Sequence, residues 1–368
     1  MRVLFAGGGT GGHLYPGLAI ARALQKLEPS IQPHFVGALR GIERNVLPTT
    51  EFPHQLLDLH PLYRSRPWEN WKTIRGAVSA WRGMSRLAHE DRPRCVVGTG
   101  GYASGIALGY AMVNGIPIVV QEQNSYPGLT TRFFSRYARQ VHNGFPEAAT
   151  RLSPGSRTTL FDSGNPIEAP PDPLPDKRTA QSLWGFTAMR RVMLVYGGSQ
   201  GSRAVNDVVA AWIARGVPEG LGVIWATGQG TYDDYASLES PGVRIRPYLS
   251  PVSEAYAATD FAISRGGAIA TAELCAWGIP PVVIPLPTAA ADHQTANARA
   301  LAQAGAAEFI PQSALTVERL SESVTALLSD DALLAQRAAS ARARARPHAA
   351  RDIAQRILEL IRSSQQVD

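Results

Sequence analysis

Several features that mark specialised classes of protein are scarce in this sequence or missing from it. The 368 residues include two cysteines, Cys95 and Cys275, which lie far apart and have no metal-ligand neighbours, so we expect the free thiols of a cytosolic protein. No stretch reaches the ~20 consecutive apolar residues that a membrane-spanning helix needs. The apolar run after Met1-Arg2 is too short for a secretory leader, and none is expected.

Two motifs of nucleotide chemistry are also missing. No Asp-x-Asp occurs, so a chelated metal ion is not the expected source of positive charge, and no Gly-Lys-Ser/Thr follows a glycine turn, which excludes a Walker loop. We predict neither a metal site nor a cofactor. The net charge of +6 favours an anionic partner, which is a nucleotide, a nucleic acid or a membrane surface. The length exceeds the usual size of one core and predicts two domains.

The N-terminal stretch predicts a strand, a glycine-rich turn and a helix. Apolar residues at 3–6 are followed by Gly7-Gly8-Gly9-Thr10-Gly11-Gly12-His13, and apolar residues then recur at helical spacing. Such a turn directs backbone N–H groups and the helix dipole at a ligand, and His13 is a candidate general base there. The glycines fit a dinucleotide fingerprint, but no carboxylate follows the second strand at 33–36, which disfavours a nicotinamide enzyme. The alternative is that the glycines only allow close packing.

Similar turns are predicted further along the first half. A strand at 95–97 precedes a second glycine turn with Tyr102, and a strand at 116–120 ends in Gln121-Glu122-Gln123-Asn124. Because strand carboxyl ends converge on one crevice in a doubly wound sheet, His13, Tyr102, Glu122 and Asn124 are candidate functional residues. The alternative for Glu122 is that it caps the following helix.

The second half repeats this organisation after the proline-rich stretch 161–175, which predicts an interdomain connection. A strand at 191–196 leads to Gly197-Gly198-Ser199, where backbone amides and the Ser199 hydroxyl suit a phosphate. A strand at 261–264 leads to Arg265-Gly266-Gly267 and a helix whose free N–H groups can hold a diphosphate. Glu273 on that helix can accept both hydroxyls of a ribose, or can be favoured there by the helix dipole alone.

The last part of the chain is predicted to be helical. Gln294 and Asn297 share a helix face and can bind sugar hydroxyls or be solvated. Surface helices are expected at 315–328 and 332–346. An amphipathic helix closes the chain at 348–362.

The segment from Pro61 to Arg94 is basic and contains tryptophans. Trp68, Trp71 and Trp81 are interleaved with the basic residues Arg64, Arg66, Lys72, Arg75, Arg82, Arg86, Arg92 and Arg94. Arginine and tryptophan at an amphipathic surface suit an anionic lipid interface and can also serve a nucleic acid. The alternative is a solvated helix face with tryptophans in the core.

In their order, these motifs resemble the bacterial peptidoglycan glycosyltransferases of family 28. The matching stretches span most of the chain and are Gly8-Gly9-Thr10-Gly11-Gly12-His13-Leu14-Tyr15-Pro16-Gly17-Leu18-Ala19, Gly98-Thr99-Gly100-Gly101-Tyr102, Glu122-Gln123-Asn124, Gly197-Gly198-Ser199-Gln200-Gly201, Ser264-Arg265-Gly266-Gly267-Ala268 to Glu273, and Asp292-His293-Gln294-Thr295-Ala296-Asn297. The resemblance implies an α/β GT-B fold, in which two Rossmann-like domains with parallel sheets face a central cleft. Residues 1–163 would bind the acceptor and the membrane, 164–347 would bind UDP-GlcNAc, and helix 348–362 would pack back onto the first domain.

The resemblance also implies roles for individual residues. For the donor UDP-GlcNAc it implies Ser199 at the phosphate, Leu249 at the uracil, Glu273 at the ribose, Gln294 and Asn124 at the GlcNAc hydroxyls, and the amides of Ala268, Ile269, Ala270, Thr271 and Ala272 at phosphate and sugar. Thr10, Gly11 and Gly12 would form the acceptor-side glycine loop. Further candidate positions are Tyr102, Asn206, Arg265 and Asn297. The chain departs from the family at Gln121, where His is frequent, and at Glu168, where Arg is frequent; we exclude Glu168 as a diphosphate ligand.

The implied reaction is an inverting transfer of GlcNAc from UDP-GlcNAc to the C4 hydroxyl of MurNAc in lipid I, which forms lipid II for peptidoglycan. His13 is our first choice of general base and Glu122 the second, with helix N-termini and Arg265 offsetting the charge of the leaving diphosphate. The enzyme would be peripheral on the cytoplasmic face of the inner membrane. Alternatives are another GT-B UDP-sugar transferase or a UDP-GlcNAc epimerase. A nucleic-acid-binding protein leaves the glycine turns unexplained, so no nucleic-acid partner is expected.

Overall fold

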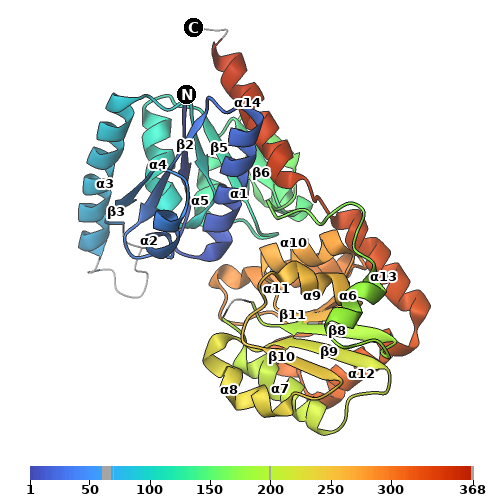
Figure 1. Cartoon of the computed structure of the whole chain (residues 1–368). Coiled ribbons are helices and arrows are strands. Elements are labelled where there is room, and N and C mark those ends of the chain that lie inside the picture. Colours follow the sequence, from blue (N-terminus) through green and yellow to red (C-terminus); the bar gives the residue numbers. More distant parts are fainter. Residues whose placement is uncertain (60–67, 69, 199, 366–368) are drawn as a thin grey trace. The chain divides into compact units, whose positions relative to one another are not determined.

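The computed structural model describes residues 1–59, 68, 70–198 and 200–365. The chain forms two units, one made of Met1–Ile167 with His348–Asp368 and the other of Glu168–Pro347 (Figure 1). The division expected between residues 163 and 164 differs from this boundary by a few residues. Asn165 belongs to the first unit because its buried side chain donates a hydrogen bond to the backbone oxygen of Gln123 at 3.0 Å.

The first unit is built on a parallel sheet of seven strands in the order β3-β2-β1-β4-β5-β6-β7. Along the chain these strands are β1 (Arg2–Ala6), β2 (Gln32–Ala38), β3 (His54–Leu57), β4 (Cys95–Gly98), β5 (Ile118–Glu122), β6 (Gln140–Asn143) and β7 (Thr159–Asp162). Its helices are α1 (Gly11–Leu27), α2 (Glu43–Val46), α3 (Asn70–Glu90), α4 (Gly101–Val113), α5 (Leu129–Phe134) and α14 (Ala349–Gln365).

Both faces of the central strands β1 and β4 are buried, which explains why these two strands are nearly continuous apolar runs. Successive side chains of β1 point to opposite faces of the sheet. Leu4 and Ala6 pack in the core on one face, while Val3 and Phe5 pack in the core on the other. On that second face the rings of Phe5 and Phe35 stack with their centroids 5.3 Å apart. The polar ends of the strands are therefore the parts of the sheet left for chemistry.

Helix α14 belongs to the first unit although it follows the second unit in the sequence. It lies alongside α1 (Figure 1). Ile353, Ile357 and Ile361 recur every four residues on one helix face and are buried in the same core as Phe5. The amphipathic pattern of α14 is thus matched by the apolar surface that it covers.

The second unit is built on a parallel sheet of six strands in the order β10-β9-β8-β11-β12-β13. The strands are β8 (Arg191–Tyr196), β9 (Leu221–Ala226), β10 (Val243–Arg246), β11 (Phe261–Ser264), β12 (Pro281–Val283) and β13 (Glu308–Phe309). The helices are α6 (Lys177–Leu183), α7 (Arg203–Ala214), α8 (Tyr232–Tyr235), α9 (Val252–Ala258), α10 (Ala268–Trp277), α11 (His293–Gln303), α12 (Val317–Ser329) and α13 (Asp331–Arg344). Neighbouring side chains of β8 again enter opposite cores. Within the described ranges, none of the helices has the length and apolar character required to cross a membrane.

A buried histidine on β6, next to the edge strand β7, is linked to α14 through Gln140. His142 Nε2 lies 3.2 Å from Gln140 Oε1, and its Nδ1 lies 2.8 Å from Ser163 Oγ. Gln140 Nε2 donates to the backbone oxygen of Arg356 at 2.9 Å, which orients the amide so that Oε1 faces the histidine. Nε2 of His142 therefore carries a proton, which it donates to Gln140 Oε1. Burial, with a smaller effect of the Arg356 charge, lowers the pKa of His142 to about 3.

We predict that this histidine makes the first unit less stable in acid. Between pH 6.5, the ordinary pKa of histidine, and about 3, the unfolded chain binds a proton that the folded chain does not. Stability that is fully present above pH 6.5 is therefore lost at about 1.4 kcal/mol per pH unit as the pH falls. His142→Gln should flatten this dependence, as measured by hydrogen exchange of the β5–β7 amides between pH 8 and 5. His348→Gln, which replaces an exposed histidine of the same unit, is the control and should keep the wild-type slope. An unchanged slope in His142→Gln would contradict the prediction.

Candidate functional site

In the first unit, the loops that follow β1, β4 and β5 are joined by hydrogen bonds around His13. Helix α1 begins at Gly11, so His13 lies in its first turn. The Thr99 hydroxyl donates to the backbone oxygen of His13 at 2.7 Å. The backbone oxygen of Thr99 accepts from Gln123 Nε2 at 2.7 Å. Gln123 Oε1 lies 2.9 Å from His13 Nδ1, which closes a ring of three residues from three loops. His13 Nε2 has no hydrogen-bond partner among the described residues.

The glycine turns allow two of these loops to meet backbone to backbone. Gly101 has a φ of +75°, and a Cβ there would lie 2.1 Å from the backbone oxygen of Gly8. Only glycine fits both the positive φ and this close approach. The glycines of the two turns thus do more than pack a helix on a strand, because they bring together the first turns of α1 and α4, which carry His13 and Tyr102.

The N-terminus of α1 carries no side-chain cap and no acidic residue in its first turn. Thr10 is the extended N-cap residue, and its backbone oxygen accepts from His13 N at 3.2 Å. The first turn of a helix leaves N–H groups without acceptors inside the helix. Thr10, Gly11 and Gly12 therefore present a positive helix end that suits an anionic or hydroxyl-bearing ligand.

Glu122 is the last residue of β5, and both of its carboxylate oxygens accept hydrogen bonds from the loop that follows this strand. Oε1 accepts from the backbone N of Asn124 at 3.0 Å and from its Nδ2 at 3.3 Å, and Oε2 accepts from the backbone N of Gly128 at 3.0 Å. Gly128 is the N-cap residue of α5, so Glu122 supports the loop that leads into this helix. Of our two candidate bases, His13 has a ring nitrogen available for a substrate proton, whereas Glu122 shapes the loop that carries Asn124.

In the second unit, the N-terminus of α10 also lacks a side-chain cap. The Thr271 hydroxyl donates to the backbone oxygens of Gly267 at 2.9 Å and Ala268 at 3.2 Å, so it is used inside the helix. Ile269, Ala270 and Ala272 are half-buried along the same helix. The first-turn amides, rather than side chains, are what α10 offers to a phosphate.

Arg265 is buried at the turn before α10, and its guanidinium is bound to protein groups. It donates to the backbone oxygens of Ile284 at 3.0 Å and Pro285 at 2.9 Å, and to the Ser202 hydroxyl at 2.6 Å. Ser202 is the N-cap residue of α7. Burial lowers the pKa of Arg265. The positive charge is therefore anchored beneath three loops by the backbone and acts there as a fixed field.

Asn206 is also fully engaged inside the second unit. Its Oδ1 accepts from Trp225 Nε1 at 3.1 Å, and its Nδ2 donates to the backbone oxygen of Thr227 at 2.8 Å. The side chain is buried. Through these contacts Asn206 joins α7 to β9 and to the loop that follows it.

Two amides on α11 differ in how much of their hydrogen bonding is used. Asn297 is buried and donates to the backbone oxygen of Gly266 at 3.0 Å, which supports the glycine turn before α10. Gln294 is half-buried, and its Oε1 accepts from the backbone N of Leu286 at 3.0 Å. The Gln294 Nε2 group has no partner in the part of the chain that the structure describes and remains available for a sugar hydroxyl. The Leu249 side chain is buried in the core, and Ser199 lies outside the described residues.

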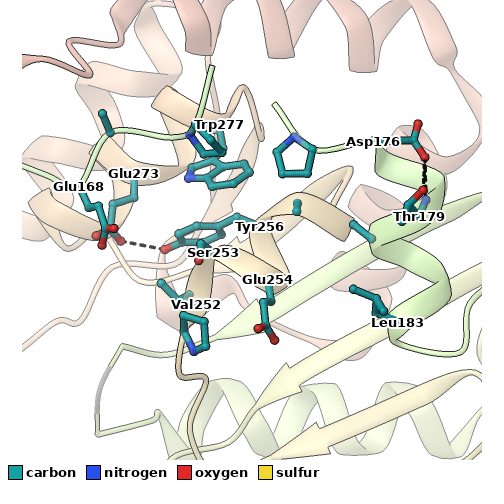
Figure 2. Close-up of a pocket in the computed structure, with 16 residues that line it drawn as sticks. Glu168, Asp176, Thr179, Leu183, Val252, Ser253, Glu254, Tyr256, Glu273 and Trp277 are labelled. Atoms are coloured by element: carbon teal, nitrogen blue, oxygen red, sulfur yellow. Dashed lines mark hydrogen bonds between the residues drawn. The ribbon is translucent and has the colours of Figure 1, made fainter. Parts of the chain in front are cut away.

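A cavity of about 680 Å³ in the second unit has Glu273 at one end (Figure 2). Its lining residues are Glu168, Ala169, Pro171, Pro175, Asp176, Thr179, Ala180, Leu183, Pro251, Val252, Ser253, Glu254, Tyr256, Ala257, Glu273 and Trp277. The hydroxyl of Tyr256 donates to Glu273 Oε2 at 2.8 Å. Burial, followed by the neighbouring Tyr196, raises the pKa of Tyr256 well above its usual value, so Tyr256 stays a donor.

The ionisation of Glu273 depends on its burial and on the neighbouring side chains of Tyr256 and Glu168. Burial raises its pKa above the usual value, the Tyr256 hydrogen bond acts in the opposite direction, and the negative charge of Glu168 raises the pKa further. The carboxyl groups of Glu168 and Glu273 lie next to each other in Figure 2. The chain therefore places a like charge beside the residue that we expected at the ribose.

Our reading of the sequence did not single out Gln123, Thr99 or Tyr256. Gln123 and Thr99 stand inside two of the motifs, so their positions carried a signal, but their contacts with His13 depend on the fold. Tyr256 lies on α9 and gives no sequence signal of its contact with Glu273. These three residues orient the side chains around which the two sites are built.

Two α/β units with parallel sheets and glycine turns at the strand ends define the GT-B class of glycosyltransferase folds. The chain belongs to glycosyltransferase family 28. The N-terminal domain of that family matches residues 3–143, and its C-terminal domain matches residues 192–357.

Relatives match the chain over nearly its whole length. The UDP-N-acetylglucosamine--N-acetylmuramyl-(pentapeptide) pyrophosphoryl-undecaprenol N-acetylglucosamine transferase of Desulforamulus reducens is 36% identical, covering 96% of this chain and 97% of that protein. The Chlorobaculum tepidum protein of the same name is 38% identical, covering 99% of this chain and 100% of that protein. The crystal structure of Acinetobacter baumannii MurG is similar with a TM-score of 0.78 and 29% identity, covering 97% of this chain and 99% of that one. The glycotransferase of kitacinnamycin, with a TM-score of 0.72 and 18% identity over 98% of both chains, is similar in fold alone.

We predict that Glu168→Gln lowers the pKa of Glu273, because it removes the neighbouring negative charge. Tyr256→Phe should raise that pKa, because the carboxylate loses its donor. Carboxyl-carbon NMR titration of the isotope-labelled protein, with the Glu273 signal assigned from Glu273→Gln, measures both shifts. Glu254→Gln, which removes another carboxyl group lining the same cavity, is the control and should leave the titration unchanged. Equal titration curves for wild type and Glu168→Gln would contradict the assignment.

Proposed function

We propose that this chain transfers N-acetylglucosamine from UDP-GlcNAc to the C4 hydroxyl of MurNAc in undecaprenyl-pyrophosphoryl-MurNAc-pentapeptide, lipid I, which yields lipid II and UDP. The observation that carries the proposal is the nearly full-length similarity to family 28 proteins whose name states this transfer. The two sets of loops described above supply the chemical groups that such a reaction requires.

The second unit is the proposed donor site. The amides at the start of α10 would hold the diphosphate, with the buried Arg265 adding positive charge nearby. Glu273, oriented by Tyr256, would accept from the ribose hydroxyls. Gln294 would donate to the GlcNAc through its remaining N–H groups, and the loop carrying Asn124 in the first unit would contact the same sugar. Ser199 and Leu249 complete the proposed contacts at the phosphate and the uracil.

The first unit is the proposed acceptor site, with His13 as general base. The C4 oxygen of the acceptor attacks the anomeric carbon of GlcNAc, and the bond from that carbon to the β-phosphate oxygen breaks with the electron pair leaving on UDP. The C4 hydroxyl proton passes to His13 Nε2. Because attack and departure occur on opposite sides of the anomeric carbon, its configuration inverts. Thr10, Gly11 and Gly12 would bind the acceptor at the N-terminus of α1.

The decisive experiment follows UDP release by the purified protein given UDP-GlcNAc and a soluble lipid I analogue. Wild type should release UDP only when the acceptor is present. His13→Ala should lower kcat by about 10²–10⁴-fold, which is the usual contribution of a general base, with little change in the KM for UDP-GlcNAc. Conversion of UDP-GlcNAc without acceptor would support an epimerase instead, and full activity of His13→Ala would eliminate the assignment of the base.

We also propose that an exposed face of α3 holds the protein at the anionic cytoplasmic surface of the inner membrane, where the lipid acceptor is found. Trp71 and Val78 are 57% and 50% exposed, and Arg75, Arg82 and Arg86 are exposed on the same helix. Their spacing of three or four residues puts them on one helix face. Trp68 is exposed as well, whereas Trp81 packs edge-on against Tyr110 in the first unit, with ring centroids 5.1 Å apart. Arg64, Arg66 and the side chain of Lys72 lie outside the described residues.

We predict that Arg75→Ala with Arg82→Ala weakens binding to phosphatidylglycerol-containing vesicles about 30-fold, because each cation near an anionic surface contributes about 1 kcal/mol. Vesicle sedimentation at fixed ionic strength measures the partition. Arg157→Ala, at an exposed arginine elsewhere in the first unit, should bind as wild type does. If Arg157→Ala lost as much vesicle binding as the double variant, the effect would come from net charge alone and not from α3. If the double variant bound vesicles as wild type does, α3 would not be part of the proposed interface.

A further inference from the structure

The amide of Gln123 has one orientation in this structure, and that orientation decides which nitrogen of His13 carries a proton. Gln123 Nε2 donates to the backbone oxygens of Thr99 at 2.7 Å and Gln121 at 3.3 Å, and it also contacts the Gln121 side-chain oxygen. All three partners are acceptors, so the NH₂ group must face them. Gln123 Oε1 then faces His13 Nδ1 at 2.9 Å as an acceptor.

The buried position of Gln123 prevents the opposite arrangement. Gln123 is 2% exposed, so no bulk water can replace a lost partner. A flipped amide would place Oε1 against the Thr99 and Gln121 oxygens and leave those acceptors without a donor. Asn165 Nδ2 donates to the backbone oxygen of Gln123, and Gln121 Nε2 donates to Asn165 Oδ1 at 3.3 Å, which fixes the surrounding chain as well.

We propose that Gln123 is a positioning residue that keeps the proton of neutral His13 on Nδ1 and leaves Nε2 as the basic nitrogen. This inference rests on the proposed function, in which Nε2 receives the proton of the acceptor hydroxyl. Proton transfer to Nε2 gives an imidazolium with protons on both nitrogens, and the Nδ1–H to Gln123 Oε1 hydrogen bond persists through that step. Gln123 therefore acts through His13 and does not touch the reacting atoms.

Packing around the imidazole supports this assignment. A Cβ on Gly100 would lie 2.8 Å from His13 Nδ1, so the β4–α4 turn approaches the ring on the side of the Gln123 contact. The Thr99 hydroxyl holds the backbone oxygen of His13 at 2.7 Å. The ring and the amide are thus held by the same turn, which links the geometry of the base to the loops after β4 and β5.

The experiment combines the nitrogen spectrum of the histidine ring with steady-state kinetics of the full chain. In ¹⁵N-histidine-labelled wild type, with the His13 signals assigned from His13→Gln, neutral His13 should show a protonated Nδ1 and an unprotonated Nε2. Gln123→Met keeps the volume and removes the acceptor, so both tautomers should appear. Loss of one orienting hydrogen bond should lower kcat about tenfold, with the KM for UDP-GlcNAc unchanged because the donor is proposed to bind mainly to the other unit.

Gln140→Met is the matched control, because Gln140 is a buried glutamine whose Oε1 accepts from another histidine, His142. It should leave the His13 spectrum and kcat as in wild type. A wild-type His13 with its proton on Nε2 overturns the proposal, as does a Gln123→Met protein with unchanged tautomer and kcat, or an equal loss of kcat in the control. The wild-type spectrum requires no variant of Gln123 to fold. If the wild type released no UDP when given UDP-GlcNAc and the acceptor, the proposed function would be refuted. The spectrum would still show which nitrogen of His13 carries the proton.

Discussion

Burial of both faces of each parallel sheet is the constraint on which the rest of this structure depends. Because helices cover both faces, the central strands are largely apolar, and most polar chemistry is left to the strand ends and the loops that follow them. In the first unit, three such loops are joined through His13, Thr99 and Gln123. In the second unit, Arg265 and Asn297 tie the corresponding loops together through backbone oxygens. Side chains at the strand ends thus either build the loops or remain available to a ligand.

The fold class could be predicted from the sequence because it depends on the order of apolar residues and glycines along the chain. Apolar runs followed by glycine turns predicted the strands at β1, β4, β8 and β11, and the amphipathic pattern of residues 348–362 predicted α14. Strand β6 could not be found in this way, because Gln140, His142 and Asn143 read as a polar loop. These side chains are buried, and Gln140 and His142 are hydrogen bonded to each other. The pattern of apolar and polar residues in a sequence shows where polar side chains stand, but it does not show which of them form hydrogen bonds inside the protein.

The candidate site was predictable to the level of the loop and not to the level of the side chain. The motifs placed His13 and Arg265 after a glycine turn and a strand, where the structure has them, whereas Glu122, expected just after its strand, is the last residue of β5. They could not show that Arg265 donates to two backbone oxygens or that Glu122 holds the start of α5. Those tasks depend on residues distant in the chain. Gln123 and Tyr256 were missed for the same reason, since each acts on a side chain from another loop or helix.

The two departures from the family pattern have different physical consequences. Gln121 is completely buried, and its amide both donates to Asn165 and accepts from Gln123, so a neutral group with both capacities satisfies the interior without a buried charge. Glu168 is exposed, so water and salt screen its charge, yet it still raises the pKa of Glu273. The first departure therefore contributes to the support of His13 through Gln123, whereas the second makes the proposed ribose contact sensitive to pH. In this chain, hydrogen-bond geometry orients the residues of the proposed acceptor site, whereas neighbouring charge controls the ionisation of Glu273 in the proposed donor site.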